Sequence, residues 1–532
     1  MNQELVKIKT ALISVSDKTN LDRLAQFLLD YNIQMISTGG TQKYLENLGF
    51  AVTPAESLTN NPEAFGGRMK SISFQISSGL LYRRYHEQDQ FEAEKLNIQA
   101  IDLVVCNLYP FEEQIKKNET DDVLIENIDI GGPLMLRASA KNFEAVTVLS
   151  DVSDYDNFIE HYLKHSATTF EFRQQQAVKT FTIVANYDQI ISQEMAARFL
   201  SKHNTSLDLI DKISLRYGEN PHQQATLSIL KNTDSKNTLT SAVVLQGKEL
   251  SYNNWLDMDS AWRVMSDVYH LLSQTQFNCV TAVVKHANPC GLSSAQNSFD
   301  SLMSAWNGDH ISSFGGIIAC SYKIELKHAE FLTKNFIEVL IAPEFSEEAI
   351  QLFETKKNVR LVQIAPRDFA QKEKIYRSIS GGMLEQNEDE LSLNTEQQKV
   401  VTQKDFKNIS TNLILFGLVA CKFLKSNGIA LVAEKNGIFN LVAAGMGQPN
   451  RLDSLRLLAH ERLKNKKNES FKDVVLISDA FFPFADSIDV CAELGIQYVV
   501  QPGGSIKDKE VIACCDRHGV AMMMTGLRHF RH

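Results

Sequence analysis

A cation and an imidazole stand side by side at the end of an apolar run. Cys279 to Val284 is typical of a buried strand, and it is followed by Lys285, His286 and then Asn-Pro and glycine, which favour a sharp turn. Imidazole exchanges protons near neutral pH, and a neighbouring ammonium group stabilises developing negative charge. Strand ends are also where α/β folds form ligand crevices. Taken alone, the segment fits a structural histidine better than a catalytic one. Whether His286 is catalytic therefore depends on the other motifs of the chain.

Hydroxyl groups and glycines follow the first two strands that the sequence predicts. Ser14 to Lys18 follows the first, while Ser37 to Thr41, with its pair Gly39-Gly40, follows the second and opens a helix. Hydroxyls, free backbone N–H groups and a helix N-terminus together form an anion site whose usual occupant is phosphate. An ordinary Gly-Gly turn is the alternative, and Lys18 is what favours phosphate.

Other polar side chains recur after predicted strands or in glycine-containing loops. In the N-terminal half they are Arg68, Lys70 and Ser71 in the loop after Gly66-Gly67, and Asn107, Tyr109, Asp129 and Lys141. In the C-terminal half they are Arg216, Tyr217, Asn427, Gln448 and Arg451, and Gly316 stands in the further glycine loop Ser312 to Gly316. Each alone could be a turn or a solvated surface; their repeated placement after strands favours a functional interpretation.

Two segments near the C-terminus leave alternatives open. The aromatic run from Phe481 to Phe484, between Asp479 and Asp486, is more typical of core, but it could form a flat slot that stacks a ring. The basic end from Arg528 to His532 is typical of a disordered tail. Because it directly follows a predicted strand, it could also fold over a site and bind an anion.

A zinc site is tested by the spacing of its ligands. Nucleobase deaminases pair His-x-Glu with a following Pro-Cys-x-x-Cys. Pro289-Cys290 begins such a motif, but Ser293 stands where the second cysteine belongs, and no His-x-Glu precedes it. We therefore expect no zinc and no other metal.

Length and composition exclude several classes of protein. At 532 residues the chain predicts two to four domains, and its 44% hydrophobic and 22% charged content is that of a globular protein. The net charge of -10 argues against nucleic-acid binding, so an anionic substrate must meet local basic residues. No run of 18 uncharged apolar residues predicts a membrane span. Eight cysteines without a Cys-x-x-Cys pair fit a reducing compartment, and we expect a cytoplasmic protein without disulfides.

The first 150 residues alternate strand and helix signals. Strands are predicted at 10–15, 33–37, 101–106 and 145–149, with one helix capped by Asn20 and another opened by Gly39-Gly40. This alternation predicts a parallel sheet covered by helices on both faces. A largely helical stretch, 152–200, follows, and the polar segment Ser201 to Lys212 is the candidate linker.

The remainder, from residue 213 to the end, shows a second α/β pattern. Asn436-Gly437 predicts a hairpin between strands at 429–433 and 438–443, and further strands are predicted at 474–478, 497–501 and 520–525. With more than 300 residues, this half is expected to hold two subdomains.

Ten motifs together resemble one enzyme family, the bifunctional purine biosynthesis enzymes that combine AICAR transformylase with IMP cyclohydrolase. AICAR is the aminoimidazole carboxamide ribonucleotide. In chain order the motifs are SVSDKT, STGGT, GGRMKS, CNLYPF, IDIGG, LRYGENPHQ, KHANPCG, SSFGG, SDAFFPF and RHFRH. They span essentially the whole chain, and ten ordered matches are specific where any one would not be.

The resemblance implies a fold and two activities. Residues 1–200 would form a methylglyoxal-synthase-like domain with IMP cyclohydrolase activity, and 213–532 two cytidine-deaminase-like subdomains without zinc. The latter would transfer formyl from the cosubstrate 10-formyltetrahydrofolate to AICAR, and the former would close formyl-AICAR to IMP. The family acts as a homodimer whose transformylase sites lie between subunits.

The resemblance also implies a role for each matching residue. For formyl transfer it implies His286 as base, Lys285 as oxyanion stabiliser and Asn427 as holder of the reacting groups. Substrate binding there would fall to Arg216, Tyr217, Gly316, Gln448, Arg451, Phe481, Asp486 and Arg528. For ring closure it implies oxyanion binding by Lys70 and Asn107 and proton handling by Tyr109, Asp129 and Lys141. The nucleotide would be held by Ser14, Lys18, Ser37, Gly39, Thr41, Arg68 and Ser71.

One departure from the family pattern lies beside the ring-closing site. Where the family usually reads T-L-H-P-K-I-H-G-G, this chain reads S-I-S-F-Q-I-S-S-G over residues 71–79, so two histidines, a proline and a lysine are absent. A tolerated loop change is the favoured explanation. The alternatives are a transformylase whose N-terminal domain only binds nucleotide, and, by fold analogy alone, a zinc deaminase.

Overall fold

Two compact units make up the protein, Met1–Ser206 and Leu207–His532, and each is described by itself. The structure is a computed structural model that describes residues 5–59, 72–200, 209–230, 238–368, 373–390, 398–459, 461–462 and 474–532. Within these ranges, no helix combines the length and apolar character that crossing a bilayer requires.

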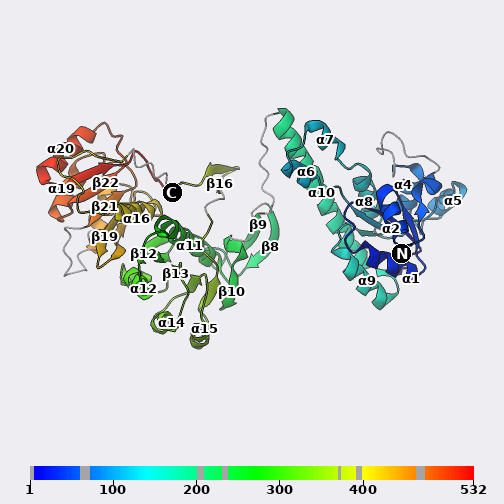
Figure 1. The fold of residues 1–532 in the computed structure, drawn as a ribbon, viewed down its shortest axis with the longest axis horizontal. Coiled ribbons are helices and arrows are strands. Elements are labelled where there is room, and N and C mark those ends of the chain that lie inside the picture. Colours follow the sequence, from blue (N-terminus) through cyan, green and yellow to red (C-terminus); the bar gives the residue numbers. More distant parts are fainter. Residues whose placement is uncertain are drawn as a thin grey trace. The chain divides into compact units, whose positions relative to one another are not determined.

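A five-stranded parallel sheet forms the centre of the first unit, with helices around it (Figure 1). Its strand order is β4-β3-β2-β5-β6. Its strands are β2 (Thr10–Val15), β3 (Gln34–Ser37), β4 (Thr53–Pro54), β5 (Leu103–Asn107) and β6 (Thr147–Leu149). A small antiparallel pair, β1 (Leu5–Val6) with β7 (Thr168–Thr169), stands apart from it. The predicted parallel sheet is confirmed, because each strand connects to the next through a helix.

Alternate residues of the strands bury against helices on opposite faces of this sheet. Ala11 and Ile13 pack with α1 (Leu21–Asp30) and α9 (Asp154–His165), whereas Leu12 packs with α4 (Phe74–Leu81), α8 (Gly131–Lys141) and α10 (Phe170–Leu200). The other helices are α2 (Gly39–Asn47), α3 (Ala55–Thr59), α5 (Glu87–Lys95), α6 (Phe111–Lys116) and α7 (Asp121–Glu126).

The second unit is built on a twelve-stranded sheet in which one pattern of elements occurs twice. The strand order is β10-β15-β14-β13-β11-β12-β20-β19-β21-β22-β23-β18. In each half a long helix precedes an antiparallel hairpin, which is followed by three strands that pair in parallel. The halves join where β12 pairs antiparallel with β20, so the parallel strands of one half run opposite to those of the other.

The first half contains α11 (Tyr252–Leu272) and the hairpin β11 (Cys279–Lys285) and β12 (Asn288–Ala295). Its other elements are α12 (Ser298–Trp306), α13 (His310–Ser313), β13 (Ile317–Cys320), α14 (Leu326–Leu332), β14 (Val339–Ala342), α15 (Glu347–Phe353), β15 (Arg360–Gln363) and the edge strand β10 (Val243–Gln246).

The second half repeats this order with α16 (Thr411–Lys422) and the hairpin β19 (Ile429–Lys435) and β20 (Ile438–Gly445). Its other elements are α17 (Arg451–Asp453), a π-helix (Ser454–Ala459), β21 (Val475–Ser478), α19 (Asp486–Glu493), β22 (Tyr498–Gln501), α20 (Asp508–His518), β23 (Ala521–Met524) and the edge strand β18 (Lys399–Val400). Two hairpins lie outside the large sheet, β8 (Leu209–Leu215) with β9 (Ala225–Leu230) and β16 (Lys374–Ile379) with β17 (Gly382–Asn387).

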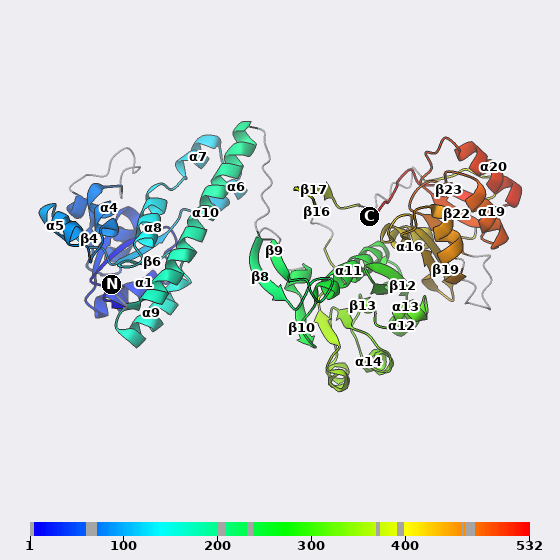
Figure 2. The same cartoon turned by 180° about the vertical axis from the view of Figure 1, so that it is seen from behind.

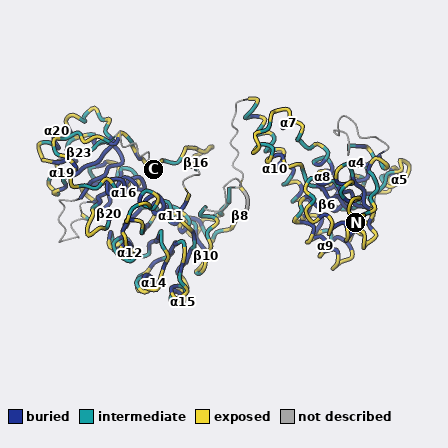
Figure 3. Tube along the Cα trace, viewed as in Figure 1, coloured by how far each residue is buried: buried dark blue, intermediate teal, exposed yellow. Residues whose placement is uncertain are grey.

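One face of the large sheet has a single core and the other has two. The long helices α11 and α16 pack together against strands of both halves (Figure 2). On the other face, α12, α14 and α15 pack in the core of the first half, and α12 also contacts β20, whereas α19 and α20 pack in the core of the second half. The burial pattern shows the strands as the buried centre of each half (Figure 3). The predicted second α/β pattern is therefore confirmed as two halves that share one sheet.

Local expectations are mostly confirmed, with two corrections. The hairpin at Asn436-Gly437 and the buried strand before Lys285 are present. Asn20 precedes α1 as predicted, but its side chain makes no capping hydrogen bond. The predicted linker 201–212 overlaps β8, which begins at Leu209, and residues 201–208 lie outside the described residues.

Candidate active sites

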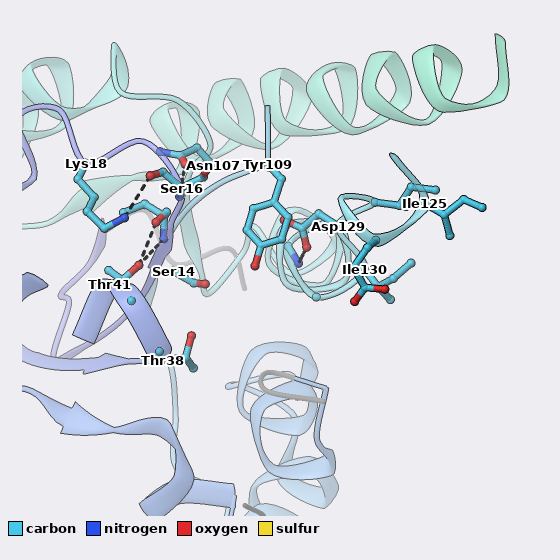
Figure 4. Close-up of a pocket in the computed structure, with 17 residues that line it drawn as sticks. Ser14, Ser16, Lys18, Thr38, Thr41, Asn107, Tyr109, Ile125, Asp129 and Ile130 are labelled. Atoms are coloured by element: carbon cyan, nitrogen blue, oxygen red, sulfur yellow. Dashed lines mark hydrogen bonds between the residues drawn. The ribbon is translucent and has the colours of Figure 1, made fainter. Parts of the chain in front are cut away.

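A polar cavity of about 690 Å³ opens where the parallel strands of the first unit end (Figure 4). Thr38, Thr41, Ser14 and Lys18 gather on one side, and Tyr109 and Asp129 lie on the other. The full lining is Ser14, Val15, Ser16, Lys18, Thr38, Gly39, Gly40, Thr41, Asn107, Tyr109, Ile125, Glu126, Ile128, Asp129, Ile130, Gly131 and Gly132. The start of α2 in this wall combines hydroxyls, glycines and a helix N-terminus, the arrangement that suits phosphate.

Two side chains brace the phosphate-type wall from within. The Thr41 hydroxyl donates to the Val15 carbonyl (3.0 Å) and accepts from the Val15 N–H (3.1 Å), which ties α2 to the end of β2. Asn107, at the end of β5, accepts from the N–H groups of Ser16 (2.6 Å) and Asp17 (2.9 Å) and donates to the Asp17 carbonyl (2.9 Å). These residues therefore shape the cavity as well as line it.

The opposite wall places a carboxylate at the start of α8. Asp129 accepts from the Gly132 N–H (2.8 Å), and a Cβ on Gly132 would lie 2.5 Å from the Asp129 carboxylate, so a larger residue there would displace this carboxylate. The Tyr187 hydroxyl, on α10, accepts from the Asp129 N–H (2.9 Å). Burial raises the pKa of Tyr187 to about 12, so it remains a neutral phenol at physiological pH.

Most of the described residues predicted for ring closure meet in this cavity, and two do not. Those that line it are Ser14, Lys18, Gly39, Thr41, Asn107, Tyr109 and Asp129. Ser37 is fully buried and donates to the Ile13 carbonyl (2.7 Å). Lys141 is exposed at the far end of α8, roughly 15 Å along the axis from Gly131 at 1.5 Å per residue. Arg68, Lys70 and Ser71 lie outside the described residues.

The segment that departs from the family pattern begins a helix rather than lining the cavity. Ser73 is the N-cap of α4, and its hydroxyl accepts from the Ile76 N–H (3.0 Å), the contact that serine supplies well at this position. In the part of the chain that the structure describes, none of residues 73–78 belongs to the cavity lining.

In the second unit, Lys285 and His286 lie at the tip of the β11–β12 hairpin. Val284 pairs with Ile317, the first residue of β13, and Ile317 is level with Val339, the first residue of β14. The Lys-His pair therefore lies at the edge where the parallel strands of its half begin. The predicted strand end and sharp turn are confirmed, and because β11 turns straight back into β12, this end of β11 lies away from the carboxyl ends of β13, β14 and β15.

Lys285 is half-buried and His286 is exposed. The Lys285 ammonium donates to the Phe314 carbonyl (2.7 Å), in the loop that leads to Gly316. Gly316 is buried, and a Cβ there would lie 3.1 Å from the Ser313 carbonyl and 3.2 Å from the Val284 carbonyl. The chain thus passes closely behind Lys285 and directs its ammonium to this edge.

Polar residues of the second half reach the same edge of the sheet. Ile429 pairs with Ser478, so Asn427 lies where β21 ends, and the opposite strand directions of the two halves bring this end beside the Lys285 end. Asn427 accepts from Arg451 (2.9 Å) and donates to the carbonyl of Gln448 (3.0 Å). Arg451, only 8% exposed, also donates to Asp479 (2.6 Å) and to the Phe481 carbonyl (2.9 Å). These bonds fix the Arg451 guanidinium, which in turn holds the Asn427 side chain in place.

The remaining predicted binding residues of the second unit differ in how far they are exposed. Gln448 and Phe481 are half-buried, whereas Asp486 and Arg528 are exposed; within the aromatic run, Phe482 is fully buried and Phe484 is 60% exposed. Arg216 is exposed and donates to the Tyr217 hydroxyl (2.8 Å). Burial first, and then the charge of Arg216, lower the pKa of Arg360 at the start of β15, which places Arg216 near the same edge.

The basic C-terminal end folds back onto the second half. The Ser426 N–H donates to the Arg531 carbonyl (2.8 Å), and the His529 N–H donates to the Asp479 carbonyl (2.9 Å). The folded alternative for this segment is therefore confirmed.

Sequence reasoning did not single out several groups that the structure places at the sites. Asp257 on α11 accepts from the backbone of the His286 turn, and Tyr187 on α10 holds Asp129. Neither belongs to a recognisable motif, because each acts through a contact between distant parts of the chain.

Metal ligation can be judged only for the described residues. Cys290, the start of the incomplete zinc motif, is half-buried, and burial raises the pKa of its thiol to about 12. A different trio, Asp489, Cys514 and His518 on α19 and α20, brings three possible ligand atoms within 4.8 Å of one another. Two of these residues are exposed, and their atoms bond to each other, with Asp489 accepting from Cys514 (3.3 Å) and pairing with His518 (3.0 Å).

Two family models match this chain. The AICARFT/IMPCHase bienzyme family matches residues 139–462, and the MGS-like domain matches residues 20–134. This chain belongs to the AICARFT/IMPCHase bienzyme family.

Similar proteins extend over its full length. The bifunctional purine biosynthesis protein PurH of Aquifex aeolicus (strain VF5) is 42% identical over 98% of this chain and 100% of its own. The protein of the same name from Listeria monocytogenes serovar 1/2a is 41% identical over 99% of this chain and 100% of its own. The crystal structure of ForH aligns with 35% of this chain and 98% of its own at 34% identity, with a TM-score of 0.31, which is too low to support a structural argument.

Proposed function

We propose that this chain converts AICAR to IMP in two steps. A formyl group passes from 10-formyltetrahydrofolate to the AICAR amine, and the resulting formyl-AICAR closes its second ring with loss of water. Membership of the bienzyme family and the names of the full-length relatives support both activities. In the structure, the proposal rests on the Lys285-His286 hairpin tip of one unit together with the hydroxyl-lined cavity of the other.

Formyl transfer needs a base, because the AICAR amine is delocalised into its ring and carboxamide. We assign the base to His286: as the amine attacks the formyl carbon, the imidazole accepts its proton. Lys285 then stabilises the tetrahedral oxyanion and donates toward the folate nitrogen as its bond to the formyl carbon breaks. A positioned base contributes roughly 10²–10⁴-fold to such a step.

Substrate binding at this site is assigned to residues of both halves. Arg216, Tyr217 and Arg528 would hold the nucleotide, since the guanidinium fork suits a phosphate. Asn427 would hold the reacting groups, and Phe481 and Asp486 would lie where the AICAR ring meets the folate, with Gly316 and Gln448 nearby. Arg451 is buried, so its support for binding is indirect, through Asn427.

Ring closure is intramolecular, and proximity supplies a large share of such a barrier. The carboxamide nitrogen attacks the formyl carbon, and water then leaves. Placement in the cavity wall supports Tyr109 and Asp129 as proton carriers, Asn107 as an oxyanion contact, and Ser14, Lys18, Gly39 and Thr41 as the phosphate side. The position of Lys141 gives no support to a role there. Arg68, Lys70 and Ser71 keep their assignment from the family motif alone.

A shared transformylase site in a homodimer accounts for the spacing of its parts. In sheet order, β11 and β19 are separated by β12 and β20, so Lys285 and Asn427 of one chain are about 14 Å apart at 4.8 Å per strand. We therefore propose that two chains complete each site. Mixing His286→Ala with Asn427→Ala chains should restore transfer if one subunit supplies each residue, and should not if both come from the same chain.

No metal is assigned to either reaction, and the protein is proposed to work in the cytoplasm. The support for that compartment is the biosynthetic family and the eight cysteines, all of which are free thiols.

The deciding experiment supplies purified protein with AICAR and 10-formyltetrahydrofolate and separates the nucleotide products by chromatography. IMP that is replaced by formyl-AICAR in an Asp129→Asn variant would support both assignments. Formyl-AICAR without IMP in the wild-type protein would mean that the first unit only binds nucleotide. Absence of folate turnover would overturn the proposal.

A further inference from the structure

The β11–β12 and β19–β20 hairpins of the large sheet share one turn conformation but not its sequence. The turn residues His286 and Ala287 have φ of 54° and 57°, and Asn436 and Gly437 have φ of 55° and 71°. Two-residue hairpins favour positive φ at both positions, and Asn-Gly is the sequence suited to it. His-Ala is unsuited, because a Cβ in the left-handed region collides with the neighbouring carbonyl. The first hairpin therefore requires support from outside.

That support comes from α11. The Asp257 carboxylate accepts from the Ala287 N–H (2.6 Å) with one oxygen and from the His286 N–H (3.2 Å) with the other. On the carbonyl side, the Ser260 hydroxyl donates to Ala287 (3.1 Å) and the Asn288 amide donates to His286 (2.8 Å). Every backbone polar group of the two turn residues is thus bonded, and Asp257 supplies half of these bonds.

We propose that Asp257 is a positioning residue for formyl transfer: its carboxylate holds the His286-Ala287 turn in the left-handed conformation that presents His286 and Lys285 at the shared edge of the sheet. The inference rests on the proposed function, since it assigns Asp257 a task only if His286 acts as the base. It does not require Asp257 to touch a substrate.

The charge of Asp257 suits this task. Hydrogen bonds to an ionised acceptor are shorter and about twice as strong as neutral ones. Burial raises the pKa of Asp257, whereas the two turn N–H groups and His286 act in the opposite direction. Keeping the half-buried Asp257 carboxylate ionised costs desolvation free energy. Its hydrogen bonds go to the turn that carries the proposed base, His286.

The test is an Asp257→Asn variant assayed for both reactions. The amide keeps the shape, but it replaces one acceptor with a donor that faces an N–H group. Because a displacement of about 1 Å in a reacting group can cost 10²-fold, we expect transfer kcat to fall about 10- to 100-fold. The KM values for AICAR and the folate should stay within about twofold, and ring closure in the other unit should be unchanged, because a positioning residue acts on the chemical step.

The chain offers a matched control in Asp102. This half-buried carboxylate also accepts from two consecutive backbone N–H groups, those of Lys9 (2.9 Å) and Thr10 (3.1 Å), but it lies in the first unit. Asp102→Asn should leave transfer unchanged. A rescue variant adds Ala287→Gly to Asp257→Asn: glycine adopts the left-handed conformation without strain and should recover part of the lost kcat.

The outcomes separate the inference from the proposed function. A wild-type protein without transfer would defeat the function and with it the inference. If the wild-type protein transfers formyl and the kcat of Asp257→Asn lies within twofold of the wild-type kcat, the inference alone is defeated. The inference is also defeated if Asp257→Asn loses transfer, ring closure and folded protein together and the added Ala287→Gly restores none of them. If Asp257→Asn does not fold, Asp257→Glu takes its place: it keeps the charge and displaces it by one methylene, and an unchanged kcat would overturn the assignment.

Discussion

The two halves of the second unit repeat one order of elements but solve the same local problem differently. In the second half, Asn436-Gly437 adopts the tight turn through its own conformational preference. In the first half, His286-Ala287 adopts the same turn against that preference and is held by Asp257 and Ser260. At the first turn position, the first half has His286, which the proposed reaction needs, where the second half has Asn436, which suits the turn conformation better.

The two halves also contribute different structural features to the shared edge of the sheet. The first contributes an exposed hairpin tip, whereas the second contributes Asn427, held by the buried pair of Arg451 and Asp479. Opposite strand directions across β12 and β20 place the start of one set of parallel strands beside the end of the other. Two copies of one pattern thereby form one composite edge.

The largest expected difference between the two hairpins is catalytic. His286→Ala should lower transfer kcat by roughly 10²–10⁴-fold, because it removes the base, while ring closure continues. Asn436→Ala, at the equivalent turn, should leave transfer within about twofold. Steady-state assays of both reactions measure this, and equal effects of the two variants would remove the functional distinction between the turns.

A buried charge in the second half should give the next largest effect. Asp479→Asn leaves Arg451 buried without its ion pair, and the loss of one partner of a buried pair costs about 3–5 kcal/mol. Urea unfolding measures this loss. The exposed pair of Lys507 and Glu510 offers the control, since Glu510→Gln should hardly change the midpoint. If Asp479→Asn is as stable as the wild-type protein, the ion pair is not what holds Arg451, and the position of Asn427 depends on its other contacts.

Acid should destabilise the first half of the second unit through His328. This residue is fully buried and accepts a hydrogen bond from the Glu325 N–H at the start of α14. Burial lowers the pKa of His328 to about 4, below the 6.5 of an exposed histidine. Only the unfolded chain binds the proton between these values, so stability falls as pH drops from 6.5 to 4, by at most about 3 kcal/mol.

Unfolding at pH 7 and at pH 5 should therefore differ less for His328→Gln than for the wild-type protein. His222→Gln, at an exposed histidine, is the control and should keep the wild-type difference. An identical pH dependence of His328→Gln and wild-type protein would show that His328 is not the source of acid sensitivity.

The smallest expected effects lie in the turns themselves. Gly437→Ala puts a Cβ into the left-handed region and should destabilise by about 1 kcal/mol, while Ala287→Gly relieves that strain and should stabilise by up to about 1 kcal/mol. Denaturant midpoints measure both. Opposite signs would confirm that strain is stored only in the first hairpin, whereas a destabilising Ala287→Gly would locate the support of that turn elsewhere.

Local sequence patterns determined much of this structure. Runs of apolar residues located β2, β11 and β21 to within a residue or two, and Asn436-Gly437 located its hairpin. The motifs identified the family and most of the residues that line the first cavity. These features depend on neighbours in the chain, whose conformational preferences and burial are readable from order alone.

Long-range pairing decided the rest. Strand register, and not motif, placed Lys285 at the starting edge of its parallel strands and brought Asn427 to that same edge. Helix length placed Lys141 away from the cavity in which the family resemblance implied a role for it. The bonds from Asp257 to His286 and from Tyr187 to Asp129 join residues 29 and 58 positions apart. Such contacts leave no local pattern, because they form only when packing of whole helices against the sheets brings the partners together.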